Sequence, residues 1–215
     1  MFIGAQVSLY PMTSDFVRVI LSALEALPPY ADRLRIETDD ISTLIVGAPE
    51  PLFAAIRDLF ARAAAGPDHV TMHATLSRGC PGEPDDPSCH CETLAVAQKL
   101  PLEARQEQAL AEVAAAPVLG VTIDVQFSLY VLGQDRHMDE IYGCIDFLRQ
   151  SGTYLKSKNF CTRLHGDVGE VFATLQQAFL RFGPAEGHVT IDLTASANSP
   201  SPKAGAKAQP LPAQG

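Results

Sequence analysis

The sequence predicts an α+β fold in which one βαββαβ unit occurs twice in tandem, each with an antiparallel sheet and its helices on one face. QVSLY at 6–10 returns as QFSLY at 126–130, and HVTMHATLS from His69 returns as HVTIDLTAS from His188. LFAAIRDLFAR from Leu52 matches VFATLQQAFLR from Val171. This offset of about 120 residues exceeds the roughly 20–50 residues of a solenoid period, so we interpret it as a duplicated domain.

The duplication divides the chain into four predicted segments. Residues 1–78 form the first repeat, 79–120 a connector, 121–197 the second repeat and 198–215 a tail. The connector begins as a loop rich in Pro, Gly and Asp, and its Ala-, Glu- and Gln-rich part predicts a helix over Pro101–Ala116. The tail is rich in Ser, Pro, Ala, Lys and Gly, a composition that predicts disorder.

The first repeat opens with a predicted strand and a predicted helix. The strand covers Ile3–Tyr10, where apolar and polar residues alternate, and Pro11 stops it. Thr13 or Ser14 can cap the helix that follows. Apolar residues recur in this helix at helical spacing and are predicted to face the core. They are Phe16, Val17, Ile20, Leu21 and Leu24.

A hairpin, a second helix and a last strand complete the repeat. Strands over Arg33–Thr38 and Ile41–Val46 are joined by a tight turn at Asp39-Asp40. Pro51 lies in the first turn of the second helix, and His69–Ser77 is the last strand. The inward residues of the second helix are predicted to be Leu52, Phe53, Ile56, Leu59 and Phe60. This order is that of the ferredoxin-like fold, and the second repeat follows it.

Strand alternation also predicts which side chains share the sheet face without helices. First and last strands are neighbours in this fold, so each repeat is expected to carry a hydroxyl-rich platform. Its members are Gln6, Ser8, Tyr10, His69, Thr71, His73, Thr75 and Ser77, then Gln126, Ser128, Tyr130, His188, Thr190, Asp192, Thr194 and Ser196. Such a face is either simply solvated or a wall that stacks on a heteroaromatic ring and hydrogen-bonds its edge.

The segment TDDIST, residues 38–43, is a second candidate for ligand binding. Its members Asp39, Asp40, Ser42 and Thr43 offer carboxylates and hydroxyls for a cation or an amino group, although two acids at a hairpin are also ordinary turn chemistry. When Gly47 and Gly166 are aligned, the second repeat reads Lys158, Asn159, Phe160, Cys161, Thr162. Thr162 then coincides with Thr43, and Asn159 replaces Asp40. We therefore predict two unequal sites, the first being the tighter.

Composition and motifs exclude several function classes. The net charge of −9 argues against a nucleic-acid partner. The chain has no nucleotide-binding glycine loop, no nucleophile elbow and no His-Glu-x-x-His motif, so catalysis is not predicted. Cys80, Cys89, His90 and Cys91 are poorly spaced for zinc, and we predict neither a metal nor a cofactor. Cys144 and Cys161 lie in apolar contexts typical of small core residues.

The apolar stretches and the N-terminal residues predict where in the cell the protein is found. Charge interrupts the longest apolar stretches well before the roughly 20 residues needed to cross a bilayer, so no transmembrane helix is expected. MFIGAQVSLY has no basic segment and no cleavage-site pattern. We therefore expect a cytoplasmic protein.

Four motifs carry a resemblance to a known family. VSLYPMTSDF (7–16), TDDIST (38–43), SRGCPGE (77–83) and LTASANSPSPK (193–203) resemble the YkoF family of thiamine/hydroxymethylpyrimidine-binding proteins, over about residues 4–203. The resemblance implies tandem ferredoxin-like domains, a homodimer and non-catalytic binding linked to uptake of the pyrimidine precursor. It carries the family's binding positions onto Leu9 and Thr43, and onto Leu129 and Thr162. Val131-Leu132 replaces the Pro-Met that follows Tyr10, a departure in the second repeat.

We therefore expect a non-catalytic, cytoplasmic and homodimeric protein that binds thiamine or its hydroxymethylpyrimidine moiety. The alternatives are a thiamine-salvage enzyme, a metal or redox protein that uses the connector cysteines, and a regulatory domain. The predicted ligand-binding residues are Ser8, Leu9, Tyr10, Asp39, Asp40, Ser42, Thr43 and His73, with Ser128, Leu129, Tyr130, Asn159 and Thr162 in the second repeat.

Overall fold

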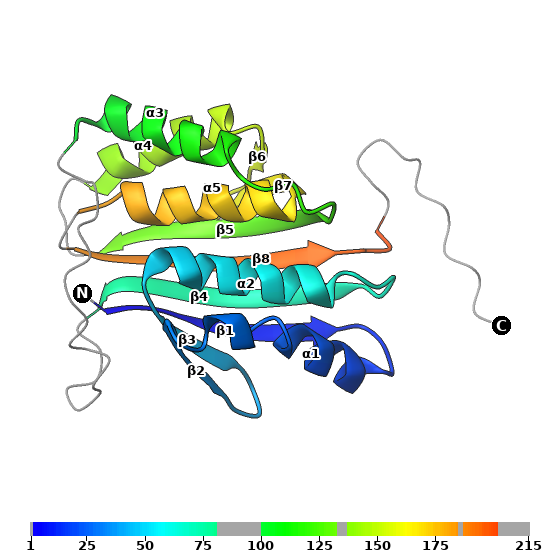
Figure 1. Ribbon diagram of the computed structural model, residues 1–215. Helices are drawn as coiled ribbons and strands as arrows, with labels where there is room; N and C mark the ends of the chain where they lie inside the picture. The colour runs from blue at the N-terminus through cyan, green and yellow to red at the C-terminus, as the bar shows by residue number, and fades with distance from the viewer. Residues whose placement is uncertain (1, 81–99, 133–136, 185–186, 202–215) are drawn as a thin grey trace.

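One continuous antiparallel sheet of eight strands forms one layer of the molecule, and the helices form the other (Figure 1). The computed structural model describes residues 2–80, 100–132, 137–184 and 187–201. The strand order is β2-β3-β1-β4-β8-β5-β7-β6, and the helices lie on one face of the sheet (Figure 1). The predicted α+β class is confirmed.

Each half of the sheet runs through the same sequence of elements. The first half comprises β1 (Phe2–Pro11), α1 (Phe16–Leu24), β2 (Leu34–Thr38), β3 (Thr43–Gly47), α2 (Pro49–Ala63) and β4 (Val70–Cys80), with a short 3-10 turn, η1 (Pro28–Tyr30), after α1. The second half comprises β5 (Thr122–Leu132), α4 (His137–Gln150), β6 (Tyr154–Ser157), β7 (Thr162–Asp167), α5 (Val168–Arg181) and β8 (His188–Ala197). Between them lies α3 (Leu102–Ala114), which matches the helix predicted in the connector.

The junction of the two halves is a strand pair that the sequence did not predict. β4 pairs with β8 in antiparallel register from Val70↔Ala197 to Arg78↔Val189. Both strands are therefore central, with β1 on the far side of β4 and β5 on the far side of β8. The halves thus share one sheet and one hydrophobic core.

The core lies between the sheet and the helices, where alternate strand residues are excluded from water. The helix-facing residues of the central strands are almost fully buried: Val70, Met72, Ala74, Leu76, Val189, Ile191, Leu193 and Ala195. All five inward residues predicted for α2 are also buried. The face assignment of β1, β4, β5 and β8 is therefore confirmed.

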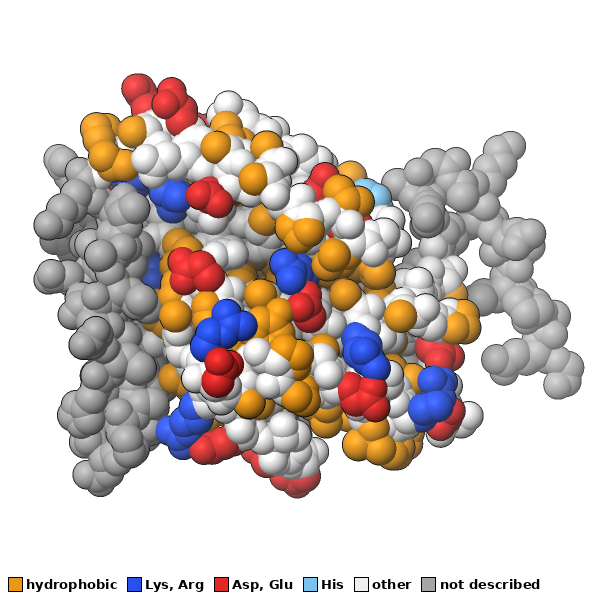
Figure 2. All heavy atoms as spheres, viewed as in Figure 1, with side chains coloured by type: hydrophobic (Ala, Val, Ile, Leu, Met, Phe, Trp, Pro, Cys, Tyr) orange, Lys and Arg blue, Asp and Glu red, His pale blue; other side chains and the backbone are white. Residues whose placement is uncertain are grey.

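The predicted inward stripe of α1 is wrong for three of its five residues. Phe16, Val17 and Leu21 are exposed, whereas Val19 and Ala23 are buried. Hydrophobic, acidic and basic side chains are interspersed on the face of the molecule that carries the helices (Figure 2).

Contact with α2 explains the orientation of α1. Arg62 of α2 donates through Nε to the Ser22 carbonyl at 2.6 Å and pairs with Glu25. These contacts hold Ser22 and Glu25 toward α2, and the small side chain of Ala23 lets α1 approach the sheet. Periodicity marks an apolar stripe but does not say which part of it faces the core.

Reciprocal capping interactions join the two halves. At the end of β4, Arg78 is fully buried and donates to the carbonyls of Phe179, Phe182 and Pro184, which follow or end α5. Just after β8, Asn198 donates through Nδ2 to carbonyls that follow α2, at Ala64, Gly66 and Asp68. Each half therefore satisfies the open helix end of the other. Burial lowers the pKa of Arg78 to about 10, so it stays charged at neutral pH.

An ion pair fixes α3 to the second half. Arg105 donates to both carboxylate oxygens of Glu140 on α4, at 2.8 and 2.9 Å. Burial acts to raise the pKa of Glu140, but the hydrogen bonds from Arg105 and from the Gly183 amide outweigh it and lower that pKa. The connector helix is thereby part of the fold.

Candidate functional site

The sheet separates the predicted site residues of the first repeat into two groups. Ser8 and Tyr10 lie on the face without helices, and Leu9 points to the helix side. Thr43 pairs with Val7, whose side chain is buried under the helices, so Thr43 also faces the helix side. The sheet thus brings Leu9 and Thr43 together on one side and separates both from Ser8.

Asp39 is committed to the structure of the hairpin turn. Its Oδ1 accepts the backbone amides of Ile41 and Ser42, each at 2.8 Å. These two hydrogen bonds lower the pKa of Asp39. Asp40 is exposed at the tip, and among the described residues it has no pairing partner. The structure therefore assigns Asp39 the turn role that the sequence allowed, and presents Asp40 to solvent.

On the helix side, Thr43 lies in an amphipathic setting. Thr43 is 5% exposed, and its hydroxyl lies 3.0 Å from the hydroxyl of Thr38 across the β2–β3 pair. Leu9 is half-buried on the neighbouring strand, two residues beyond Val7, the register partner of Thr43. A hydroxyl pair beside an apolar surface suits a flat ligand that carries hydrogen-bonding groups on its edge.

The flank of α1 that faces away from α2 borders this region. Ser22 faces α2, and at 100° per residue Ile20 and Leu24 lie about 160° around the helix from it. Both side chains are half-buried. Because α1 packs against α2 and β1, and α2 packs against α5 at the centre, the flank with Ile20 and Leu24 points away from the centre of the helical layer. We define the helix-side region as Leu9, Thr43, Ile20 and Leu24.

The second repeat reproduces the two key positions. Phe127 pairs with Thr162, so Thr162 and Leu129 again share the helix side of the sheet. The hydroxyl network differs, because Ser157 lies 3.0 Å from the hydroxyl of Tyr154. Among the described residues, Thr162 has no side-chain hydrogen-bond partner. Thr43 and Thr162 are therefore equivalent in the structure as well as in the alignment of the two repeats.

The platform on the open face is largely bonded to itself. His73 Nε2 lies 3.4 Å from Asp192 Oδ2, and Thr75 donates to the same carboxylate at 3.3 Å. Ser8 is only 9% exposed, since it lies in register with His73. Ser128 donates to the Phe160 carbonyl at 2.7 Å. Tyr10 and Tyr130 remain about half exposed.

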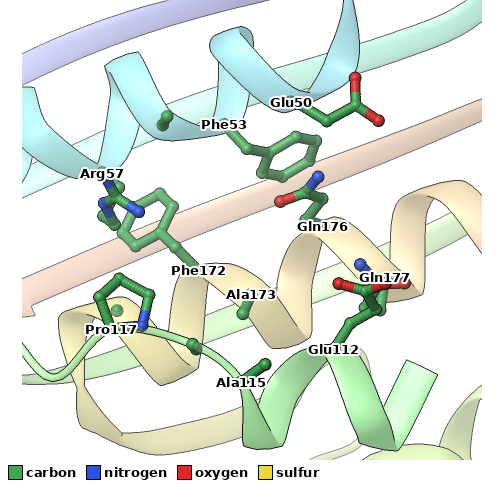
Figure 3. Close-up of a pocket in the computed structure, with 13 residues that line it drawn as sticks. Glu50, Phe53, Arg57, Glu112, Ala115, Pro117, Phe172, Ala173, Gln176 and Gln177 are labelled. Carbon is green, nitrogen blue, oxygen red and sulfur yellow. The ribbon is translucent and has the colours of Figure 1, made fainter. Parts of the chain in front are cut away.

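A cavity of about 210 Å³ lies elsewhere, between α2, α5 and the end of α3 (Figure 3). Phe53 and Phe172 line it from equivalent positions of the two repeats, and Glu50, Arg57 and Glu112 lie among its other lining residues. It contains none of the predicted site residues. Its volume is below the roughly 300–1,000 Å³ of pockets that hold drug-sized ligands. We interpret it as a gap at the interface between the helices of the two halves.

The structure bears only in part on metal and cysteine chemistry. Within 2–80, 100–132, 137–184 and 187–201, no group of three His, Cys, Asp or Glu side chains could hold a metal ion. Cys89, His90 and Cys91 lie outside the described residues, as does most of the connector loop. Cys144 is buried, and burial raises the pKa of its thiol, whereas Cys161 is partly exposed. No helix in the described part of the chain is long and apolar enough to cross a membrane.

The architecture defines a duplicated α+β protein whose halves share one antiparallel sheet. The chain belongs to the YkoF-related family, whose model matches residues 2–83 and 122–202. A relative from Bacillus subtilis (strain 168), named "Putative HMP/thiamine-binding protein YkoF", is 31% identical over 200 residues. That match covers 93% of this chain and 92% of the relative. The resemblance inferred from the motifs is confirmed.

Proposed function

We propose that this protein binds thiamine or its hydroxymethylpyrimidine moiety, without catalysis, in the helix-side region of the first repeat and at Leu129 and Thr162 of the second. The observation that carries the proposal is that Leu9 and Thr43 share one face of the sheet. These family positions come from neighbouring strands, and Thr43 is in register with Val7, two residues before Leu9; Leu129 and Thr162 are related in the same way. Since the relative's name describes HMP/thiamine binding, its ligand is the natural candidate here.

The chemistry of the region suits such a ligand. Leu9, Ile20 and Leu24 offer apolar surface to a flat ring, and Thr43 offers a hydroxyl already oriented by Thr38. The charge of Asp40 at the hairpin tip favours the cationic ring of thiamine. The open-face residues Ser8, Tyr10 and His73 cannot contact the same small ligand as Thr43, because the sheet lies between them.

Further parts of the proposal concern organisation and role. We propose that each half is a ferredoxin-like unit, that two chains form a homodimer, and that binding serves uptake or salvage of the precursor in the cytoplasm. The β-α-β-β-α-β order of each half supports the first statement. Sedimentation of purified protein tests the dimer, and recovery of unaltered thiamine after incubation tests the absence of catalysis.

Calorimetric titration with thiamine tests the sites. We expect two sites per chain, with Thr43→Val weakening the tighter one about tenfold and Thr162→Val affecting the weaker one, because each variant loses one hydroxyl to the ligand. Ser8→Ala on the open face is the matched control and should leave both sites unchanged. Unchanged binding in Thr43→Val, or loss of binding in Ser8→Ala, would contradict the helix-side assignment.

A further inference from the structure

The cavity between α2, α5 and the end of α3 is large enough for a small ring compound. Its volume is about 210 Å³. An engineered apolar cavity of about 150 Å³ already binds benzene. Phe53 and Phe172 line the cavity from equivalent positions of the two repeats, and each is followed by an alanine, Ala54 and Ala173, that also lines it. The lining therefore offers apolar surface to the body of a small ligand.

Close packing of the connector on α5 forms the third wall of the cavity. Gly169 lies in the first turn of α5, and a Cβ atom at this position would lie only 1.8 Å from the Pro117 carbonyl oxygen. The equivalent residue of α2 is Glu50, which is exposed and also lines the cavity. The connector can therefore pack this closely only on the second repeat, and the first repeat contributes a carboxylate in the equivalent place.

A buried amide group on α5 is available to a ligand in the cavity. Gln177 lines the cavity and is only 6% exposed. Its Oε1 accepts from Arg181 Nε at 2.5 Å, so its Nε2 amino group points the other way. No group in the described part of the chain accepts a hydrogen bond from that amino group. Because a buried donor costs free energy unless it is bonded, this group is suited to donate to an acceptor on a ligand.

The charges around the cavity favour a cation. Arg57 lines the cavity, but its guanidinium is bonded to Asp58, with Nε and Nη2 each 2.7 Å from Oδ1. The charge of Glu112 is partly balanced by Arg181. Within the residues that the structure describes, Glu50 has no ion-pair partner, and it lies toward the same end of the cavity as Glu112 (Figure 3). A carboxylate is thus available at that end.

We propose that this cavity is a binding site for a small organic cation, a flat ring that carries an ammonium group and a hydrogen-bond acceptor. The ring packs on the side chains around Phe53 and Phe172, the ammonium group bonds the Glu50 carboxylate, and the acceptor receives the Gln177 amide. A charge-assisted hydrogen bond of this kind is about twice as strong as a neutral one. The site shares no residue with the helix-side region, so the inference is independent of the proposed function.

The experiment is a chemical-shift titration of isotope-labelled full-length protein with three probes of similar shape. They are meta-aminomethylpyridine, meta-hydroxymethylpyridine, which lacks the ammonium group, and benzylamine, which lacks the ring acceptor. We expect the first probe to bind about tenfold more tightly than the alcohol and about threefold more tightly than benzylamine. The amides of Phe53, Ala115 and Gln177 should shift, and those of Leu9 and Thr43 should not.

Three variants test the roles of the residues. Glu50→Gln should remove the preference for the amine over the alcohol. Glu107→Gln is the matched control, because Glu107 is an exposed carboxylate on α3 outside the cavity lining, and it should keep the preference. Ala54→Leu should fill the cavity and abolish binding of all three probes. The amide spectrum of each variant shows whether it is folded.

Several outcomes would overturn the inference. They are an absence of binding to the wild type, equal binding of amine and alcohol, and binding that survives Ala54→Leu in a folded variant. Shifts at Leu9 and Thr43 that excess thiamine reverses would place the amine in the helix-side region, which would overturn this inference and leave the proposed function standing. Absence of thiamine binding would overturn the proposed function alone.

Discussion

The two repeats build the same strands and hairpins but stabilise them with different side chains. In the first, Asp39 orders the turn and Thr38 orients Thr43. In the second, Lys158 occupies the position of Asp39, and the hydroxyl of Ser157 turns to Tyr154. Duplication preserved the backbone, while the polar groups around the hairpin diverged. Equal folds therefore need not give equal sites.

The helix ends show the same divergence. Asp167 caps α5, accepting the Gly169 amide, and it also accepts the amides of Leu119 and Gly120 from the connector. The equivalent residue before α2 is Ala48, which provides no side-chain cap. The second repeat thus has its own device for fixing the connector to the helical layer.

The largest expected effect concerns the two reciprocal caps. Arg78→Met should lower the free energy of unfolding by about 3 kcal/mol or more, because two buried carbonyls and one part-buried carbonyl lose their donor together. Asn198→Ala should cost about 1 kcal/mol, since water can reach the carbonyls that this exposed residue serves. Urea denaturation measures both. Equal effects of the two variants would show that burial does not distinguish the caps.

A smaller effect is expected at the helix start. Asp167→Ala should lower the free energy of unfolding by about 1–2 kcal/mol, whereas Ala48→Asp should raise it by up to about 1 kcal/mol, making the two helices alike. Denaturation in urea compares these variants with the wild type. A neutral Asp167→Ala variant would mean that water replaces the carboxylate at no cost.

Asp167 also predicts a pH dependence. Burial acts to raise its pKa, but the backbone hydrogen bonds from Leu119, Gly169 and Gly120 outweigh it and lower that pKa. A carboxyl group with a lowered folded-state pKa stabilises the fold above its ordinary pKa, and this contribution is lost as the pH falls through the lowered value. The stability difference between wild type and Asp167→Ala should therefore shrink in acid.

The smallest effect should appear at the hairpin tips. The lowered pKa of Asp39 means that acid removes the carboxylate that holds the Ile41 and Ser42 amides, so the first tip should loosen as the pH falls below the ordinary aspartate range. The second tip has Lys158 there and should not respond. Amide chemical shifts followed between pH 7 and acid measure both tips, with Asp39→Asn as the pH-independent control. A parallel response of the two tips would refute the comparison.

Local sequence patterns determined the repeat, the order of elements and the faces of four strands. The strand predictions are correct because alternate residues of β1, β4, β5 and β8 are buried, so apolar and polar residues alternate along these strands. The sequence also predicted that Thr43 and Thr162 are equivalent, since both coincide when Gly47 and Gly166 are aligned. The divergent charges at the hairpins are also visible in the sequence alone.

Only the tertiary structure decided which predicted site residues meet. The strand β3 is apolar on both sides, because Leu44 and Val46 share the face of Gln6 and Gly4, so alternation cannot tell where Thr43 points. Its pairing with β1 settles that, and a shift of one residue would reverse it. The orientation of α1 and the β4–β8 junction likewise depend on contacts between distant segments, and such contacts leave no local period in the chain.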